Sequence, residues 1–209
     1  MKVLLVNGSS NMAGSTFTAL SEVSRILSEE GIDTEIFQLG SAPISDCTAC
    51  GACSILKRNR CVIKDDCINE LIEKAETADG FVFGTPVYYA HPSGRLLSAL
   101  DRAFYAGGAA FAHKPGFAVA VARRAGTTAA LDAVLKHLTI NQMPVISSTY
   151  WSMVHGANAA DVPKDAEGMQ TMRNAARNMA WLLKCIEAGK AAGIRAPKAE
   201  RGSWTNFIR

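Results

Sequence analysis

Short apolar segments alternate with longer amphipathic ones along most of this chain. Runs of aliphatic residues bounded by Gly, Asn, Asp or Pro are too short for helices and predict strands at 2–7, 33–38, 80–84, 116–122 and 142–147. Between and after them, apolar residues recur at helical spacing and predict helices at 14–30, 67–77, 92–105, 127–139 and 163–188. This alternation is the pattern of repeated βαβ units, so we expect a parallel sheet.

Five strands joined by helices indicate one doubly wound α/β sheet with helices on both faces. Because such crossovers are right-handed almost without exception, the simplest strand order is 2-1-3-4-5. A length of 209 residues suffices for one core and is marginal for two. We therefore predict one domain at 1–189 with a cysteine-rich insertion at 41–66, and a C-terminal arm at 190–209. A second insertion, at 148–161, carries aromatic residues.

Composition and charge narrow the class of protein. Hydrophobic residues make up 48% of the chain and charged residues 20%, the profile of an ordinary globular protein. The net charge of +3 is small and the basic residues are scattered, so we expect no nucleic-acid partner. The chain starts without a signal-peptide apolar segment and contains no run of membrane-spanning length. We therefore expect a cytoplasmic protein with no membrane partner.

Small and hydroxyl-bearing residues follow the first predicted strand. Positions 7–16 read Asn-Gly-Ser-Ser-Asn-Met-Ala-Gly-Ser-Thr and lead into the first helix. Free amides and the positive dipole end at a helix start attract an anion, and side chains such as Ser9 and Thr16 can add hydrogen bonds. Gly-x-x-x-x-Gly-Lys and Gly-x-Gly-x-x-Gly are both missing, which favours a monophosphate. The alternative is an ordinary helix cap.

A second polar segment, Thr-Pro-Val-Tyr-Tyr at 85–89, ends the third predicted strand. In the expected strand order it lies beside the end of the first strand, at the topological switch point where open parallel sheets bind ligands. Adjacent Tyr88 and Tyr89 suit a flat ring with polar edges. The alternative is that one of the two tyrosines packs in the core or in an interface.

Together with Ser-Gly-Arg-Leu-Leu-Ser-Ala-Leu-Asp-Arg at 93–102, these segments resemble the NADPH-dependent FMN reductase and iron-sulfur flavoprotein group over roughly residues 1–125. The resemblance implies a flavodoxin-like fold, bound FMN, NAD(P)H as a co-substrate and a homo-oligomer, either dimer or tetramer. It implies that the first loop holds the FMN phosphate and ribityl chain and that 86–89 holds the ring. The predicted FMN-binding residues are Ser9, Asn11, Met12, Gly14, Ser15, Thr16, Thr85, Pro86, Val87, Tyr88, Tyr89, Arg123, Arg124 and Gly126.

The loop after the fourth predicted strand departs from this group. A glycine-rich turn is usual there, whereas this chain has Arg-Arg-Ala-Gly-Thr at 123–127. A positive side chain near the N1 and O2 edge of a flavin stabilises its anionic reduced form. We therefore predict that Arg123 or Arg124 tunes the flavin potential.

Four cysteines of the first insertion, Cys47, Cys50, Cys53 and Cys61, are spaced Cys-x2-Cys-x2-Cys-x7-Cys. In a reducing compartment such spacing indicates metal binding or redox chemistry before disulfides. Thiolates are the soft ligands that iron-sulfur clusters select, and two-residue spacings let them reach one cluster. The motif also resembles that of iron-sulfur flavoproteins, where it ligates a four-iron four-sulfur cluster. The sequence leaves three alternatives for this motif: an iron-sulfur cluster, thiols without metal, or zinc. Zinc normally uses two separated pairs of cysteines.

The sequence thus predicts an FMN-dependent oxidoreductase that takes electrons from NAD(P)H or a reduced carrier. The flavin performs the chemistry, so we predict no catalytic acid or base. Its redox partner is a small molecule or an electron carrier. Two alternatives stay open: a non-catalytic electron carrier like flavodoxin, which the basic pI of about 8.5 disfavours, and an FMN-only reductase of quinones, azo compounds or flavins with spectator cysteines.

Overall fold

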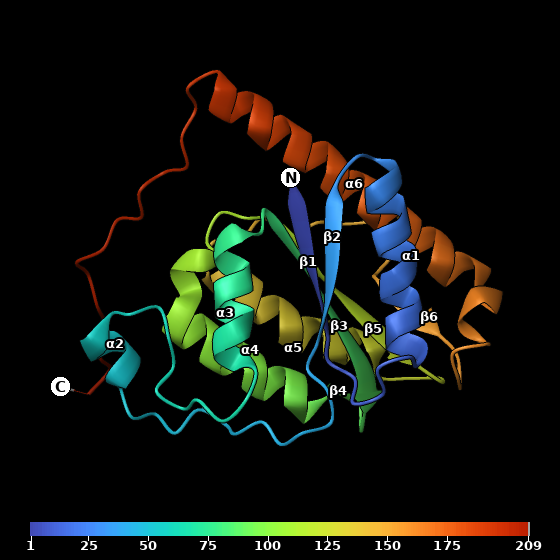
Figure 1. The fold of residues 1–209 in the computed structure, drawn as a ribbon, viewed down its shortest axis with the longest axis horizontal. Helices are drawn as coiled ribbons and strands as arrows, with labels where there is room; N and C mark the ends of the chain where they lie inside the picture. Colours follow the sequence, from blue (N-terminus) through green and yellow to red (C-terminus); the bar gives the residue numbers. More distant parts are fainter. Residues whose placement is uncertain (209) are drawn as a thin grey trace.

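A computed structural model describes residues 1–208 and shows one sheet between two layers of helices (Figure 1). The strands are β1 (Lys2–Asn7), β2 (Asp33–Gln38), β3 (Gly80–Tyr88), β4 (His91–Pro92), β5 (Gly116–Ala122) and β6 (Met153–His155). The helices are α1 (Ser15–Glu29), α2 (Ala52–Leu56), α3 (Ile68–Thr77), α4 (Gly94–Gly107), α5 (Thr127–Ile140) and α6 (Ala166–Ala191), with short 3-10 turns at Gly108–Ala110 and Val162–Lys164. The parallel strands follow the order β2-β1-β3-β5-β6, and β4 pairs with β3 in the antiparallel sense.

The two faces of the sheet form separate cores because side chains alternate along each strand. In β1, Val3 and Leu5 pack with α1 and α6, whereas Leu4 and Val6 pack with α3, α4 and α5. Figure 1 shows α3 and α4 on one side of the strands and α1 on the other. The predicted doubly wound, flavodoxin-like arrangement is therefore confirmed.

The prediction of a strand at 142–147 was wrong, because the edge strand lies farther along the chain. Only one bridge forms at the predicted place, between Gly116 and Val145. After Ile146 donates to the Gly116 carbonyl at 2.9 Å, the chain turns outward. It returns at Ser152, whose carbonyl accepts from Ala120 at 3.1 Å, and β6 follows. The second insertion therefore contains the fifth parallel strand of the sheet.

Strand β3 is longer than predicted, because it continues through Pro86. That residue pairs with Val121 of β5, while β1 has already ended opposite Gly84. The missing N–H of Pro86 faces the side where β1 has ended, so it removes no ladder hydrogen bond. The extension carries Tyr88 beyond the sheet edge.

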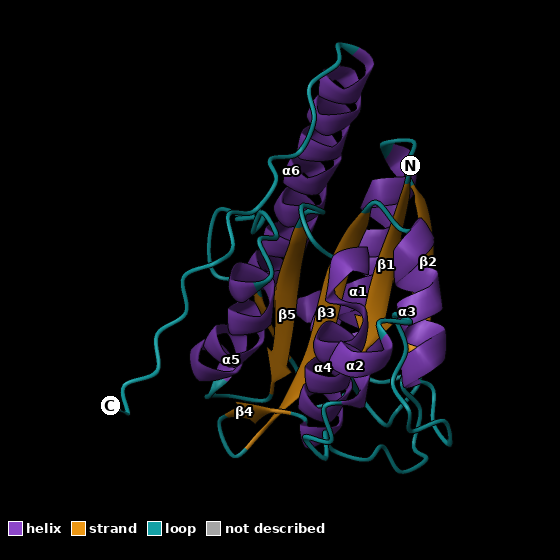
Figure 2. Ribbon diagram, turned by 90° about the vertical axis from the view of Figure 1, so that its left-hand side faces the viewer, coloured by secondary structure: helices purple, strands orange, loops and turns teal. Residues whose placement is uncertain are grey.

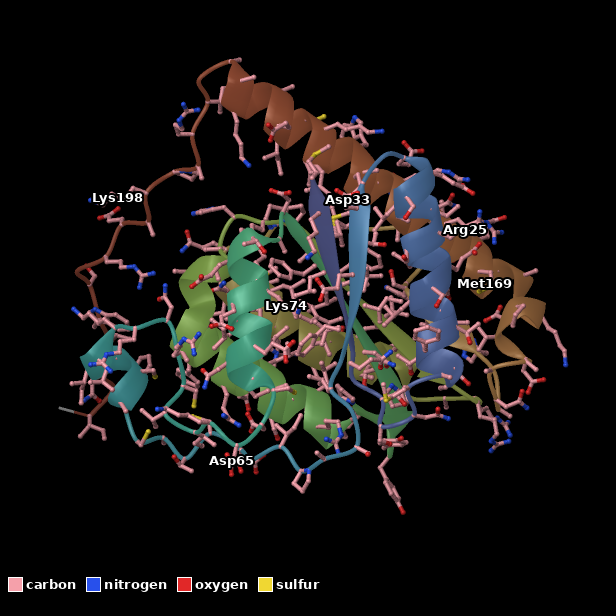
Figure 3. The ribbon with its side chains drawn as sticks, viewed as in Figure 1. Arg25, Asp33, Asp65, Lys74, Met169 and Lys198 are labelled. Atoms are coloured by element: carbon pink, nitrogen blue, oxygen red, sulfur yellow. The ribbon has the colours of Figure 1, made fainter. Side chains whose placement is uncertain are left out.

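The C-terminal arm leaves the domain at the end of α6. Residues 192–208 form neither helix nor strand, and Figures 1 and 2 show them turning back at the end of α6 and running down the outside of the domain. Lys198 marks its middle in Figure 3, far from Met169 near the start of α6. Trp204 and Phe207 are 87% and 92% exposed. Within residues 1–208, no helix is both long enough and apolar enough to cross a membrane.

Candidate functional site

Three loops meet at the carboxyl ends of β1, β3 and β5. Asn7 is in register with Gly84, and the Gly8 amide donates to the Gly84 carbonyl at 2.8 Å. A side chain on Gly8 would meet that carbonyl and Leu96 at 2.8 Å, so only glycine fits this close approach. The structure thus brings the sequence-predicted segments 9–16, 85–89 and 123–126 to one edge of the sheet.

Polar contacts fix the loop after β1 at both of its sides. Asn7 is fully buried; its Nδ2 donates to Gln38 Oε1 at 2.7 Å, and its Oδ1 accepts from the Ser9 amide at 3.1 Å. On the other side, Ser93 Oγ donates to the Gly8 carbonyl at 2.6 Å. These contacts join the loop to β2 and α4, so its shape is set before any ligand arrives.

The start of α1 is open to an anion. Its N-cap residue, Gly14, supplies no side-chain cap, and the first turn holds no acidic residue among those the structure describes. The Ser9 and Asn11 side chains accept from loop amides two residues ahead, each at 3.1 Å. Asn11 and Met12 are exposed. Uncapped amides with the positive dipole end fit a phosphate monoester, the group by which FMN would be held here.

Tyr88 and Tyr89 lie on a tight hairpin that projects from the end of β3. Tyr88 pairs with His91, and the two turn residues Tyr89 and Ala90 have φ of 49° and 61°. Positive φ at both positions is the geometry of a two-residue hairpin turn and is uncommon for tyrosine. Tyr88 is 54% exposed and Tyr89 completely exposed, so neither packs in the core of this chain.

The loop after β5 touches this hairpin through Gly126. Its φ is +92°, and a Cβ there would lie 2.6 Å from the Cα of Ala90. Arg123 and Arg124 are exposed in the same loop. Their effect on a flavin stays a prediction, but their loop lies directly against the tyrosine hairpin.

The four motif cysteines all line one small pocket of about 30 Å³ beside α4. Cys47 and Cys50 are exposed, and Cys53 and Cys61 are partly buried. The Ala52 amide and the Thr48 side chain hold the pKa of the Cys50 thiol below its usual value. Four thiols that line one pocket are the right type of ligand for an iron-sulfur cluster, because such clusters bind soft thiolates. Within residues 1–208, however, no three His, Cys, Asp or Glu side chains are grouped as a metal site.

Sequence reasoning missed Arg102 of α4, whose side chain is 1% exposed. Its Nε lies 3.4 Å from Cys61 Sγ, and its two terminal nitrogens bind Asp66 and the carbonyls of Ser45 and Ile63. Burial is the largest single influence and opposes the charge of Arg102, but the hydrogen bonds to Asp66 and Cys61 together with their negative charges outweigh it and raise the pKa of the guanidinium. The sequence feature that could have identified it is an arginine among the apolar positions of α4. An arginine buried there requires charged or polar partners.

Comparison with known proteins agrees with this geometry. The family model for NADPH-dependent FMN reductase matches residues 1–158. An iron-sulfur flavoprotein of Methanocaldococcus jannaschii is 30% identical over 195 residues, covering 90% of this chain and 100% of that protein. An FMN-dependent NADPH-azoreductase of Staphylococcus saprophyticus is 36% identical over 102 residues, 48% of this chain and 51% of that protein.

Among solved structures, a flavodoxin from the domain Archaea superposes with a TM-score of 0.58 at 12% identity, covering 88% of this chain and 99% of that one. Identity this low speaks to the fold alone, and the fold agrees with the strand order described above. The family match extends over all three loops at the carboxyl edge of the sheet. From this match we conclude that the chain belongs to the NADPH-dependent FMN reductase family of flavodoxin-like oxidoreductases.

Proposed function

We propose that this protein is an FMN oxidoreductase in which the four motif thiols hold a four-iron four-sulfur cluster. NAD(P)H or a reduced carrier is its donor, and a small molecule or an electron carrier is its acceptor. The observation that carries the cluster is that Cys47, Cys50, Cys53 and Cys61 line the same pocket, although the first and the last are fourteen positions apart. Cys67 and Cys185 do not line it.

In this proposal the loop after β1 and the start of α1 hold the FMN phosphate and ribityl chain, through Ser9, Asn11, Ser15 and Thr16. The hairpin of Tyr88 and the loop around Gly126 border the ring. When bound, FMN supplies hydride and single-electron chemistry, while the protein binds, orients and sets the electrostatics. The chain's own contribution is a pre-shaped, amide-rich loop for the phosphate and two exposed aromatic rings at the sheet edge.

An iron-sulfur cluster exchanges single electrons, which is the chemistry it would add beside a two-electron flavin. For the thiols to bind it, the segment from Cys47 to Cys53 must close toward Cys61. Cys47 and Cys50 are exposed, and Gly51, at φ +69° with nothing within 4 Å of its Cβ position, can adopt backbone conformations that other residues rarely reach.

Anaerobic purification followed by iron, sulfide and flavin assays tests this proposal. We expect one FMN and about four irons per chain by the stoichiometry of such a cluster, with a broad absorption beneath the flavin bands. Substitution of Cys53→Ser or Cys61→Ser removes the iron and leaves FMN bound. Cys185→Ser, an exposed cysteine on α6, is the matched control and retains both. Iron well below one atom per wild-type chain contradicts the cluster, whereas absence of FMN contradicts the whole proposal.

A second candidate is an FMN-only reductase with spectator cysteines. It is favoured by the lack of a grouped metal site within residues 1–208 and by the similarity to an azoreductase, which covers 48% of the chain. Under this candidate the four Cys→Ser variants reduce an azo dye or a quinone with NADPH as fast as the wild type. Loss of that turnover in the serine variants, with FMN retained, excludes it.

A further inference from the structure

The loop that carries the cysteines is held against one stripe of α4. Arg95, Ser98 and Arg102 lie on that stripe at helical spacing. Arg95 donates to the carbonyls of Ser41 and Ala42, and Ser98 Oγ donates to Asp46. Arg102 reaches the far end of the loop at Cys61. The loop has little secondary structure of its own, so these side chains define its path.

Cys61 is the one motif cysteine held at both its backbone and its sulfur. Asn69 of α3 accepts from the Cys61 amide at 2.8 Å and donates to the Cys61 carbonyl at 3.0 Å. The Nε–H of Arg102 points to the sulfur at 3.4 Å. The buried Arg102–Asp66 pair cannot swing away without leaving a charge unpaired in the interior, so the guanidinium is a fixed donor.

We propose that Arg102 is a positioning residue that presents Cys61 as the preformed corner of the thiol pocket. With a cluster bound, the same guanidinium N–H would be the group that donates to this sulfur. Cys47, Cys50 and Cys53 then close on a site whose fourth corner already exists. The part of this inference that concerns bound iron rests on the proposed cluster. The part that concerns the order of residues 61–66 does not require metal.

Three variants test the proposal. Arg102→Lys keeps the charge but loses the planar fork that reaches Asp66, two carbonyls and a sulfur together. Arg102→Gln combined with Asp66→Asn removes both charges, so that neither is left buried alone. Arg95→Gln is the matched control, because Arg95 belongs to the same helix and binds the same loop without touching a cysteine.

The first readout is hydrogen exchange of the metal-free protein. We expect amides of residues 61–66 to exchange on the order of tenfold faster in both Arg102 variants than in the wild type. Arg95→Gln accelerates exchange at 41–46 instead. Flavin content and circular dichroism identify a variant that fails to fold; if the double variant does so, Arg102→Lys decides the question.

The second readout is the metal after anaerobic reconstitution. We expect the double variant to lose iron and Arg102→Lys to retain it with a reduction potential more negative than that of the wild type, because a hydrogen bond to a ligand sulfur is lost. Exchange at 61–66 equal to that of the wild type in the Arg102 variants overturns the proposal, and so does an unchanged potential in Arg102→Lys. If the wild type itself takes up no iron, the proposed cluster fails and the exchange result alone decides the role of Arg102.

Discussion

Ser93 Oγ donates a 2.6 Å hydrogen bond to the carbonyl of Gly8, a residue 85 positions earlier in the chain. The same oxygen accepts from the Leu96 amide at 3.2 Å and so caps α4. One buried hydroxyl thus fixes both the phosphate-side loop and the start of the helix that carries Arg102. Helix capping and the shape of the proposed FMN site are therefore coupled through a single side chain.

We predict that Ser93→Ala lowers the free energy of unfolding by about 2 kcal/mol, because it removes a helix cap and leaves the buried Gly8 carbonyl without this donor. FMN binding weakens as well, since the loop loses one of its two anchors. Urea unfolding of the FMN-free protein and flavin-fluorescence titration measure the two effects. Ser10→Ala, in the same loop but exposed, should leave both unchanged. Normal FMN affinity in the Ser93 variant would contradict the coupling.

The sequence was sufficient for the sheet order and for placing three loops at one edge of the sheet, because both follow from the order of strands and helices along the chain. A short apolar run predicts a buried strand, and a loop of small residues before a helix predicts an anion site. The edge strand was misplaced because 142–147 is as apolar as a strand, whereas the actual pairing of Met153–His155 depends on where the chain returns to β5. Arg102 was missed because its partners, Asp66 and Cys61, come from a distant loop.

Gly126 offers a test of the contact between two loops of the site. We predict that Gly126→Ala destabilises the fold by about 2 kcal/mol or more, because the new methyl group meets backbone strain at φ +92° and Ala90 at 2.6 Å. Gly40→Ala is the matched control, since its φ is +69° with nothing within 4 Å. It should cost only the strain, about 1 kcal/mol. Equal costs for the two variants, measured by chemical unfolding, would show that the Ala90 contact is not tight.

The hairpin turn predicts opposite effects on stability and flavin binding. Tyr89 adopts φ 49° while its ring is completely exposed, so Tyr89→Gly relieves backbone strain and should raise the free energy of unfolding by up to about 1 kcal/mol. The same substitution removes a ring from the border of the proposed FMN site, so flavin affinity should fall. Trp181 is also an exposed aromatic residue, but it lies on α6. Trp181→Ala is therefore the control and should change neither quantity.

Glu22 predicts how part of the stability depends on pH. Its hydrogen bond from Arg25, together with one from Arg173 of α6, holds its pKa below the ordinary value of 4.5. A depressed folded-state pKa contributes stability above the unfolded pKa and loses it as the pH falls through the folded value. Glu22→Gln should therefore cost about 1 kcal/mol at pH 7, and this cost should shrink as the pH falls below 4.5 through the depressed folded-state pKa. Arg25, labelled in Figure 3, also pairs with the exposed Glu29. The control variant Glu29→Gln should cost little in either pH range, because an exposed ion pair contributes little.

The C-terminal arm predicts how copies of the chain associate. Trp204 and Phe207 expose 87% and 92% of their surfaces, and large apolar side chains gathered on one extended segment indicate a partner surface. If that partner is a second copy, a chain ending after Ala192 should bind FMN normally but sediment as a smaller species than the full chain. Trp204→Ala combined with Phe207→Ala should act in the same direction, whereas Trp181→Ala should not. An unchanged mass by light scattering in both arm variants would contradict association of copies through the arm.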